Sequence, residues 1–240
     1  MKKKIVINIV FISILLIFLV FSFNLNNSTS NIYTEVIFTD APPQFTSEMD
    51  IRNKIHFYNE SIERLNNLND INTRLLEDSI ESLNYVKNAE VYLSKDKLTI
   101  LIQEEQPFIK TTVNNETYYL SEEGKRLNLV EGRSREVLYF ICNKRIKNWN
   151  KVIQLADFIY SNDFLRSFVS KVVVRKNADF ILYSDFFETN INIGDLHQLN
   201  KKIELIKLFF SEIDKNKALM KSKLIKELNV KYENQIISVK

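Results

Sequence analysis

The sequence has few of the residues that build covalent cross-links, metal sites or flexible repeats. Its 240 residues include one cysteine, three glycines, three prolines and two histidines. The single cysteine, Cys142, excludes an intramolecular disulfide and a cysteine-based zinc site. The low glycine and proline content excludes collagen-like repeats. The two histidines, His56 and His197, stand in no metal-ligand spacing such as HExxH, so we expect neither a metal nor a cofactor.

An excess of charge of one sign is also missing from most of the chain. The net charge of +3 is carried by Lys2, Lys3 and Lys4. Without these three of the 33 Lys and Arg residues, the remaining 30 equal the 30 Asp and Glu residues. Nucleic-acid binding needs a clustered positive field, which this balance does not favour. The hydrophobic fraction of 45% and the charged fraction of 26% are those of a globular chain.

One long apolar run lies near the N-terminus. Residues 5–23 carry no charge, and as a helix they would span about 28 Å, close to the bilayer core of about 30 Å. A cleaved signal peptide is the alternative, but its apolar region is usually shorter and residues 28–30 are a weak cleavage site. We therefore predict a transmembrane helix over 5–23. The lysines before it predict that residues 1–4 stay in the cytoplasm and that everything from about Asn24 onward, beginning with a tether at 24–31, lies outside it.

Residues 32–107 are predicted to form an α+β unit of the order β-α-α-β-β. Strand composition at 32–39 is followed by two helical stripes, one from Ile51 to Leu65 with Thr46 or Ser47 as N-cap, and one that begins near Asn72. Alternating apolar residues then predict strands at 89–93 and 98–102. Two helices packed on one face of three strands give a two-layer unit.

Residues 108–240 are predicted to form a second mixed α/β unit. A hairpin with its turn at Asn114 and Asn115 begins it, and Gly124 supplies a positive φ for the next turn. Further segments are expected as follows: a strand at 137–141, a helix with Trp149, Ile153, Ala156 and Tyr160 as its stripe, another turn or two of helix at 164–169, strands at 172–174, 180–183 and 189–193, a helix from Leu199 to Ile213, and a closing strand at about 228–239.

Four segments resemble motifs of one known family. They are Val-Lys-Asn-Ala-Glu-Val-Tyr at 86–92, Leu-Thr-Ile-Leu-Ile-Gln-Glu-Glu-Gln-Pro at 98–107, Tyr-Tyr-Leu-Ser-Glu-Glu-Gly at 118–124 and Asn-Val-Lys-Tyr-Glu-Asn-Gln-Ile at 229–236. Their order after an anchor resembles FtsQ/DivIB, a bitopic cell-division family with a POTRA domain followed by a β domain. Two positions depart from its pattern: Glu105 replaces an arginine and Ser121 replaces an aspartate.

The resemblance implies a non-enzymatic divisome scaffold in the inner membrane, with both domains periplasmic. Residues 32–107 would be the POTRA-like domain and residues 108–240 the β domain. The partners implied are the periplasmic segments of FtsB/FtsL-type bitopic proteins, which link the family to septal peptidoglycan synthesis. Neither nucleic acid nor a small-molecule substrate is expected.

A C-terminal strand at the edge of a sheet can accept a partner strand through its free backbone groups. We expect Tyr232 and Ile236 to provide apolar anchors, with Lys231 and Glu233 adjusting the charge match; packing of Tyr232 in the core is the alternative. The candidate partner-binding residues are Val230, Lys231, Tyr232, Glu233, Asn234, Gln235 and Ile236.

Other functions and other roles for these residues stay open. One alternative is a membrane-anchored POTRA-type adaptor of a secretion or envelope-assembly system. A cell-wall enzyme is disfavoured because the adjacent carboxylates Glu104 and Glu105 would point to opposite faces of a strand. The lysine-rich end near residues 215–226 fits a solvated face, with anionic lipid or a partner as the alternative. Trp149 and Cys142 are expected in the core.

Overall fold

The computed structural model describes most of the chain after residue 32. The described residues are 33–40, 42–62, 71–94, 97–143, 146, 148–175, 179–184, 189–215, 225–232 and 235–239. The predicted transmembrane helix at 5–23, the tether at 24–31 and Leu65 lie outside these ranges. Within them, no helix is both long and apolar enough to cross a bilayer.

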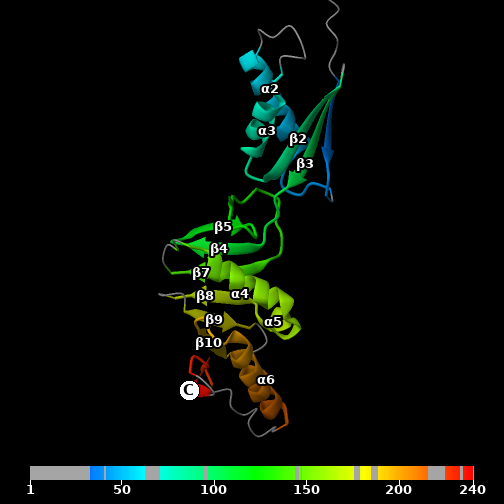
Figure 1. Cartoon of the computed structure of the whole chain (residues 1–240). Helices are drawn as coiled ribbons and strands as arrows, with labels where there is room; N and C mark the ends of the chain where they lie inside the picture. Colours follow the sequence, from blue (N-terminus) through cyan, green and yellow to red (C-terminus); the bar gives the residue numbers. More distant parts are fainter. Residues whose placement is uncertain are drawn as a thin grey trace, which may run out of the picture.

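Residues 33–104 form a three-stranded sheet with two helices on one face, which we call the N-terminal unit (Figure 1). Its elements are β1 (Tyr33–Phe38), α2 (Glu48–Ile62), α3 (Thr73–Glu81), β2 (Val86–Ser94) and β3 (Lys97–Glu104). The strand order is β1-β3-β2, with β1 parallel and β2 antiparallel to β3. Ile51 of α2 and Ile80 of α3 are fully buried against Ile100 and Ile102 of β3. The predicted β-α-α-β-β order is confirmed.

Side-chain caps fix where these helices begin. The Ser47 hydroxyl accepts the N–H of Asp50 at 3.1 Å, and the Asp50 carboxylate accepts the N–H of Ser47 at 3.0 Å, a reciprocal cap. Asn72 caps α3 by accepting the N–H of Leu75 at 3.2 Å. Ser47 is thus the cap of α2, while the Thr46 hydroxyl instead donates to the Tyr85 carbonyl at 3.2 Å.

Residues 106–239 form the C-terminal unit, in which helices cover one face of a nine-stranded sheet (Figure 1). Its elements are β4 (Ile109–Val113), β5 (Glu116–Leu120), β6 (Arg126–Leu127), β7 (Leu138–Cys142), α4 (Asn150–Ser161), α5 (Asp163–Phe168), β8 (Lys171–Val174), β9 (Phe180–Tyr183), β10 (Asn190–Gly194), α6 (Leu199–Lys215), β11 (Glu227–Asn229) and β12 (Ile237–Val239). The strand order is β12-β11-β10-β9-β8-β7-β4-β5-β6, so β12 and β6 are the edges. The mixed α+β class is confirmed.

Two turns occur where the sequence predicts them. Asn114 and Asn115 have φ values of 50° and 68°, the left-handed pair that a two-residue hairpin with the twist of its strands requires. Gly124 has a φ of 82°. The predicted stripe of α4 is confirmed at Ala156, which is fully buried, whereas Trp149, Ile153 and Tyr160 are half-buried. The other fully buried residues of the helix are Val152, Leu155 and Ile159.

The expected single strand at 228–239 is wrong. Two strands of three residues, β11 and β12, run antiparallel to each other instead. The ladder to β10 ends after the Val230 N–H, because the next backbone donor, the Lys231 N–H, is directed to the Asn229 side chain at 3.1 Å. The chain then turns, with the Gln235 N–H directed to the Tyr232 carbonyl at 3.4 Å, and returns as β12.

The two units meet in a small aromatic cluster. Phe45 and Tyr85 of the N-terminal unit stack with ring centroids 4.5 Å apart, and Phe45 meets Tyr119 of the C-terminal unit edge-on at 6.1 Å. Leu127 of β6 completes the cluster and is fully buried. Hydrophobic burial therefore joins the units directly.

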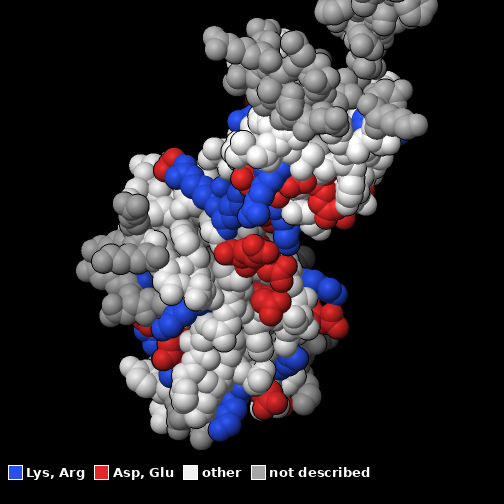
Figure 2. Space-filling model, turned by 45° about the horizontal axis from the view of Figure 1, so that its top comes forward, with Lys and Arg blue, Asp and Glu red and all other residues white. Residues whose placement is uncertain are grey.

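Polar contacts reinforce this joint. The Tyr85 hydroxyl donates to the Asn128 carbonyl at 2.5 Å, and the Lys125 ammonium donates to the Val86 carbonyl at 2.9 Å. Lys87 pairs with Glu123 at 3.2 Å across the junction. Figure 2 shows basic and acidic side chains side by side where the units meet.

Candidate functional site

The candidate site lies at the end of the sheet formed by β10, β11 and β12. The structure brings Val230, Lys231, Tyr232, Gln235 and Ile236 into the turn between β11 and β12 rather than into a strand. The two other candidate residues, Glu233 and Asn234, lie outside the described residues. The site is therefore a turn beside an edge strand, and the edge itself is β12.

The described turn residues have different environments. Val230 is fully buried, and its N–H donates to the Asn192 carbonyl at 3.0 Å, which extends the ladder by one bond beyond β11. Ile236 is half-buried against the main core. Tyr232 is 56% exposed, so its ring is not part of the core. Among the described turn residues, Tyr232 is the large apolar side chain available for a partner.

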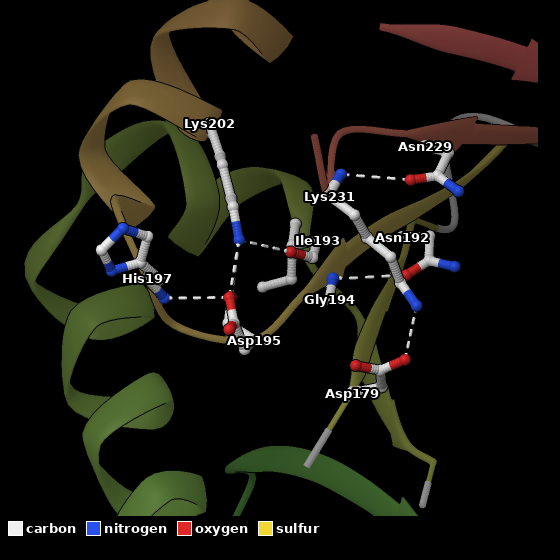
Figure 3. Close-up of polar contacts among 9 residues, drawn as sticks. All are labelled: Asp179, Asn192, Ile193, Gly194, Asp195, His197, Lys202, Asn229 and Lys231. Carbon is white, nitrogen blue, oxygen red and sulfur yellow. Dashed lines mark hydrogen bonds and ion pairs between the residues drawn. The ribbon is translucent and has the colours of Figure 1, made fainter. Parts of the chain in front are cut away.

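Lys231 is already occupied by a contact within the unit. Its ammonium lies 2.5 Å from the Asp179 carboxylate, and its N–H donates to Asn229 Oδ1 at 3.1 Å (Figure 3). The stem of Lys231 covers Gly194 so closely that an added Cβ would lie 2.7 Å from Lys231 Cγ. Lys231 thus fixes the path of the turn, which differs from the charge-matching role expected from the sequence.

A polar cluster holds α6 to the end of β10. Lys202 of α6 is 7% exposed, and its ammonium donates to the Ile193 and Asp195 carbonyls at 2.8 and 2.9 Å. It also contacts Asp195 Oδ1 at 3.1 Å, which accepts the His197 N–H at the same distance (Figure 3). These donors hold the pKa of Asp195 below its ordinary value, mainly through the Lys202 hydrogen bond. The cluster anchors the last three strands to the helical layer.

The hydrogen bonds between β10 and β11 determine which way the backbone groups of β11 point. Asn190 donates its N–H to the Lys226 carbonyl at 2.9 Å, and Val230 donates to the Asn192 carbonyl at 3.0 Å. Backbone groups alternate sides along a strand, so the even-numbered residues of this segment face β10. The backbone N–H and C=O groups of Glu227 and Asn229, the two end residues of β11, therefore point toward β12.

This alternation identifies the free backbone groups of the edge. Ile237 and Val239 of β12 lie opposite Asn229 and Glu227 of β11. The central residue of β12, Ser238, lies opposite Leu228. Ser238 consequently directs its N–H and C=O away from the sheet. Ile237, beside it, is 43% exposed. Among the described residues no strand pairs with this side of β12, so Ser238 offers one donor and one acceptor there, next to the exposed Ile237 and after the turn that carries the exposed Tyr232.

Sequence reasoning placed Ser238 and Ile237 in the closing strand but not among the candidate residues. The only signal available was the alternating pattern that runs to the C-terminus, and it does not show which residues turn outward. Lys202 was also missed, because a lysine within an amphipathic helix is expected to face solvent.

The structure shows no arrangement typical of metal chemistry in the part of the chain that it describes. No group of three or more His, Cys, Asp and Glu side chains is placed there to hold a metal ion. Cys142 is buried as expected, and burial raises the pKa of its thiol to about 11.

Comparison with known proteins identifies the C-terminal unit. No curated protein matches the chain. A family model described as FtsQ/DivIB, C-terminal related, matches residues 106–239. These are the residues that build the nine-stranded sheet and its helices. Because the match covers more than half of the 240 residues, the chain belongs to this FtsQ/DivIB-related family.

Proposed function

We propose that this protein is a non-enzymatic scaffold of bacterial cell division that binds partner proteins through the free edge at β12. The family match points to cell division. The observation that carries the binding site is the outward N–H and C=O of Ser238 on an edge strand with exposed apolar neighbours. The partners are the periplasmic segments of FtsB/FtsL-type bitopic proteins, and through them the scaffold acts on septal peptidoglycan synthesis.

In this proposal the protein crosses the inner membrane once. Residues 5–23 form the anchor, the N-terminus is cytoplasmic, and both units are periplasmic. The β-α-α-β-β order and the strand order β1-β3-β2 support a POTRA-type N-terminal unit that contacts other division proteins.

Binding at β12 follows the mechanism of strand addition. A partner strand donates to the Ser238 carbonyl and accepts from the Ser238 N–H, which gives affinity that depends little on sequence. Specificity comes from Tyr232 and Ile237, because a half-exposed ring and a branched aliphatic chain beside the edge bury apolar area on binding. Lys231 contributes by holding the turn in place through Asp179.

The test compares Ser238→Pro with Ser238→Ala in the full-length protein in its native membranes. Proline removes the outward donor without removing a ladder bond to β11, and alanine keeps the donor. A photo-reactive amino acid at Tyr232 reports partner capture by cross-linking. We expect Ser238→Pro to reduce capture of small bitopic division proteins about tenfold or more, which corresponds to about 1.4 kcal/mol, and Ser238→Ala to leave it unchanged.

If a folded Ser238→Pro protein captures partners as well as the native protein, the proposal that partners bind at the β12 edge is refuted. Circular dichroism of both variants verifies that the fold is retained. Capture of secretion or envelope-assembly components in place of division proteins would favour the adaptor function.

A further inference from the structure

The nine-stranded sheet has a second face, on the side away from the helices. Successive side chains of a strand point to opposite faces. Phe140, Val172 and Leu182 lie in the core that the helices cover. The alternate residues of these strands and of β4 therefore form the other face, which none of the described helices covers and which we call the open face: Lys110, Thr112, Tyr139, Ile141, Lys171, Val173, Ile181 and Tyr183. Ile181 is buried, and the other side chains of this set are half-buried.

The strand register places four of these side chains in one row across the open face. Lys110 of β4 lies opposite Tyr139 of β7. Tyr139 in turn lies opposite Lys171 of β8, which lies opposite Tyr183 of β9. Neighbouring strands are about 4.8 Å apart, so the two tyrosines are separated by about 9.6 Å across the sheet, and so are the two lysines. The row thus alternates lysine and tyrosine with a period of two strands.

Contacts along the row keep these side chains on the open face. The Tyr139 hydroxyl lies 2.8 Å from Thr112 Oγ1, which lies 2.7 Å from Thr117 Oγ1 of β5. The Lys171 ammonium lies 5.0 Å from the centroid of the Tyr183 ring. A cation–π contact at a half-exposed site is weak, so the ammonium can exchange the ring for a carboxylate. The hydroxyl contact holds the Tyr139 ring in place, which lowers the entropy lost when a ligand covers it.

Positive charge predominates on this row. Lys110 and Lys171 are the charged residues of the open face, and neither forms an ion pair with another described residue. In the same row, the first acidic side chain among the described residues is Glu227 of β11, two strands beyond Tyr183. Its carboxylate already accepts a hydrogen bond from the Asn192 amide at 2.9 Å. Charge complementarity therefore favours a ligand that carries negative charge.

The period of the row matches that of a polyproline II helix. This conformation has three residues per turn and rises about 3.1 Å per residue, so its residues i and i+3 lie on one side about 9.3 Å apart. An α-helix repeats about every 5.4 Å, and side chains on one face of a β-strand are about 6.8 Å apart, so neither fits the tyrosine spacing as closely. Surfaces lined by aromatic rings are those that proline-rich segments recognise.

We propose that the open face binds a proline-rich, acidic segment of a partner protein in the polyproline II conformation. Prolines at positions i and i+3 lie on Tyr139 and Tyr183, and acidic residues beside them face Lys110 and Lys171. Because this conformation is already populated in a free proline-rich chain, binding orders little backbone. The site goes beyond the β12 proposal, because it uses side chains on a face of the sheet and not the backbone groups of an edge.

Fluorescence anisotropy of a labelled peptide tests this proposal with the full-length protein in mild detergent. The peptide has about 12 residues, with proline at every third position and glutamate after each proline, so that it spans the row in any frame. One matched peptide has lysine in place of glutamate, and another has glycine in place of proline. We expect saturable binding of the proline–glutamate peptide that weakens as salt is raised, no binding of the lysine peptide, and at least threefold weaker binding of the glycine peptide.

The decisive variant is the double substitution Lys110→Gln and Lys171→Gln, and its control is Lys151→Gln with Lys201→Gln. Each pair removes two positive charges, but the control lysines are exposed on α4 and α6, on the helical side of the sheet. We expect the Kd of the proline–glutamate peptide to rise about 3- to 10-fold in the first variant and to stay unchanged in the control. Tyr183→Leu, which keeps an apolar side chain but removes the ring, should weaken binding as well.

Three results would overturn the proposal: no saturable binding of the proline–glutamate peptide, equal binding of the glycine peptide, or equal loss in the two lysine variants. Circular dichroism verifies that each variant keeps its fold. Ser238→Pro in the same titration keeps the two proposals apart, because it is expected to leave peptide binding at the open face unchanged.

Discussion

Glu104 is expected to contribute strongly to stability, and Glu104→Ala tests this directly. The residue ends β3 and is 5% exposed. Its carboxylate accepts the backbone N–H groups of Gln44, Phe45 and Thr46 at 2.9, 2.7 and 2.6 Å. One side chain therefore fixes the segment that leads into α2 and that positions Phe45 in the joint.

The magnitude follows from the number and type of these bonds. A hydrogen bond to a charged group contributes about 1.5–3 kcal/mol, but three bonds to one carboxylate are not additive, and water partly replaces them. Alanine leaves three backbone donors without this acceptor. We expect a loss of about 3–5 kcal/mol, a large part of a typical folding stability of about 5–15 kcal/mol.

Urea unfolding of the full-length protein in detergent, followed by circular dichroism, measures this loss. With an m-value of about 2 kcal/mol/M, the midpoint should fall by about 1.5–2.5 M. Glu131→Ala is the control, because Glu131 is exposed and its removal should change stability by less than about 0.5 kcal/mol. A loss below about 1.5 kcal/mol for Glu104→Ala would refute the role assigned to these three bonds.

Three further predictions concern single side chains. The Cys142 thiol, with its pKa raised to about 11 by burial, should not react with a disulfide reagent near pH 8 until urea unfolds the unit; reaction at the rate of a free thiol would contradict its burial. Gly194→Ala should destabilise by about 1–3 kcal/mol because of its φ of 66° and the contact with Lys231, and adding Lys231→Ala should restore part of the loss in thermal unfolding. Burial raises the pKa of Glu105, so its contribution to stability is present at low pH and is lost as pH rises through its folded pKa. The difference in Tm between Glu105→Gln and the native protein should therefore increase in favour of the variant from about pH 4 to pH 7. A Tm difference that does not change with pH would refute this.

The sequence was most informative where a local pattern and the packing agree. The hairpin at Asn114 and Asn115 was predictable because two adjacent asparagines tolerate positive φ, which the turn requires. Likewise α6 carries apolar residues at helical spacing over its whole length, and Ile203 and Ile206 are buried as expected.

It was less informative where a neighbouring element decides the outcome. Val230, Tyr232 and Ile236 have strand composition, and no glycine or proline interrupts them, so the sequence predicts one long strand. The strand ends early where Lys231 turns, and Lys231 is held there by the Asp179 carboxylate and by packing over Gly194, contacts with residues distant in the chain that no local pattern shows. The free edge could be predicted as a class of site, but its exposed backbone groups could not.

The joint between the two units has a mechanical consequence for any partner held at β12. A linker that merely tethered the units would let the C-terminal unit swivel. Here the edge-on contact of Phe45 with Tyr119, the hydrogen bond from the Tyr85 hydroxyl to Asn128 and the Lys125 contact with Val86 join the two units directly. These contacts therefore fix the orientation of the β12 edge relative to the N-terminal unit. A pulling force applied at β12 therefore reaches the N-terminal unit through these contacts, without first extending a flexible linker.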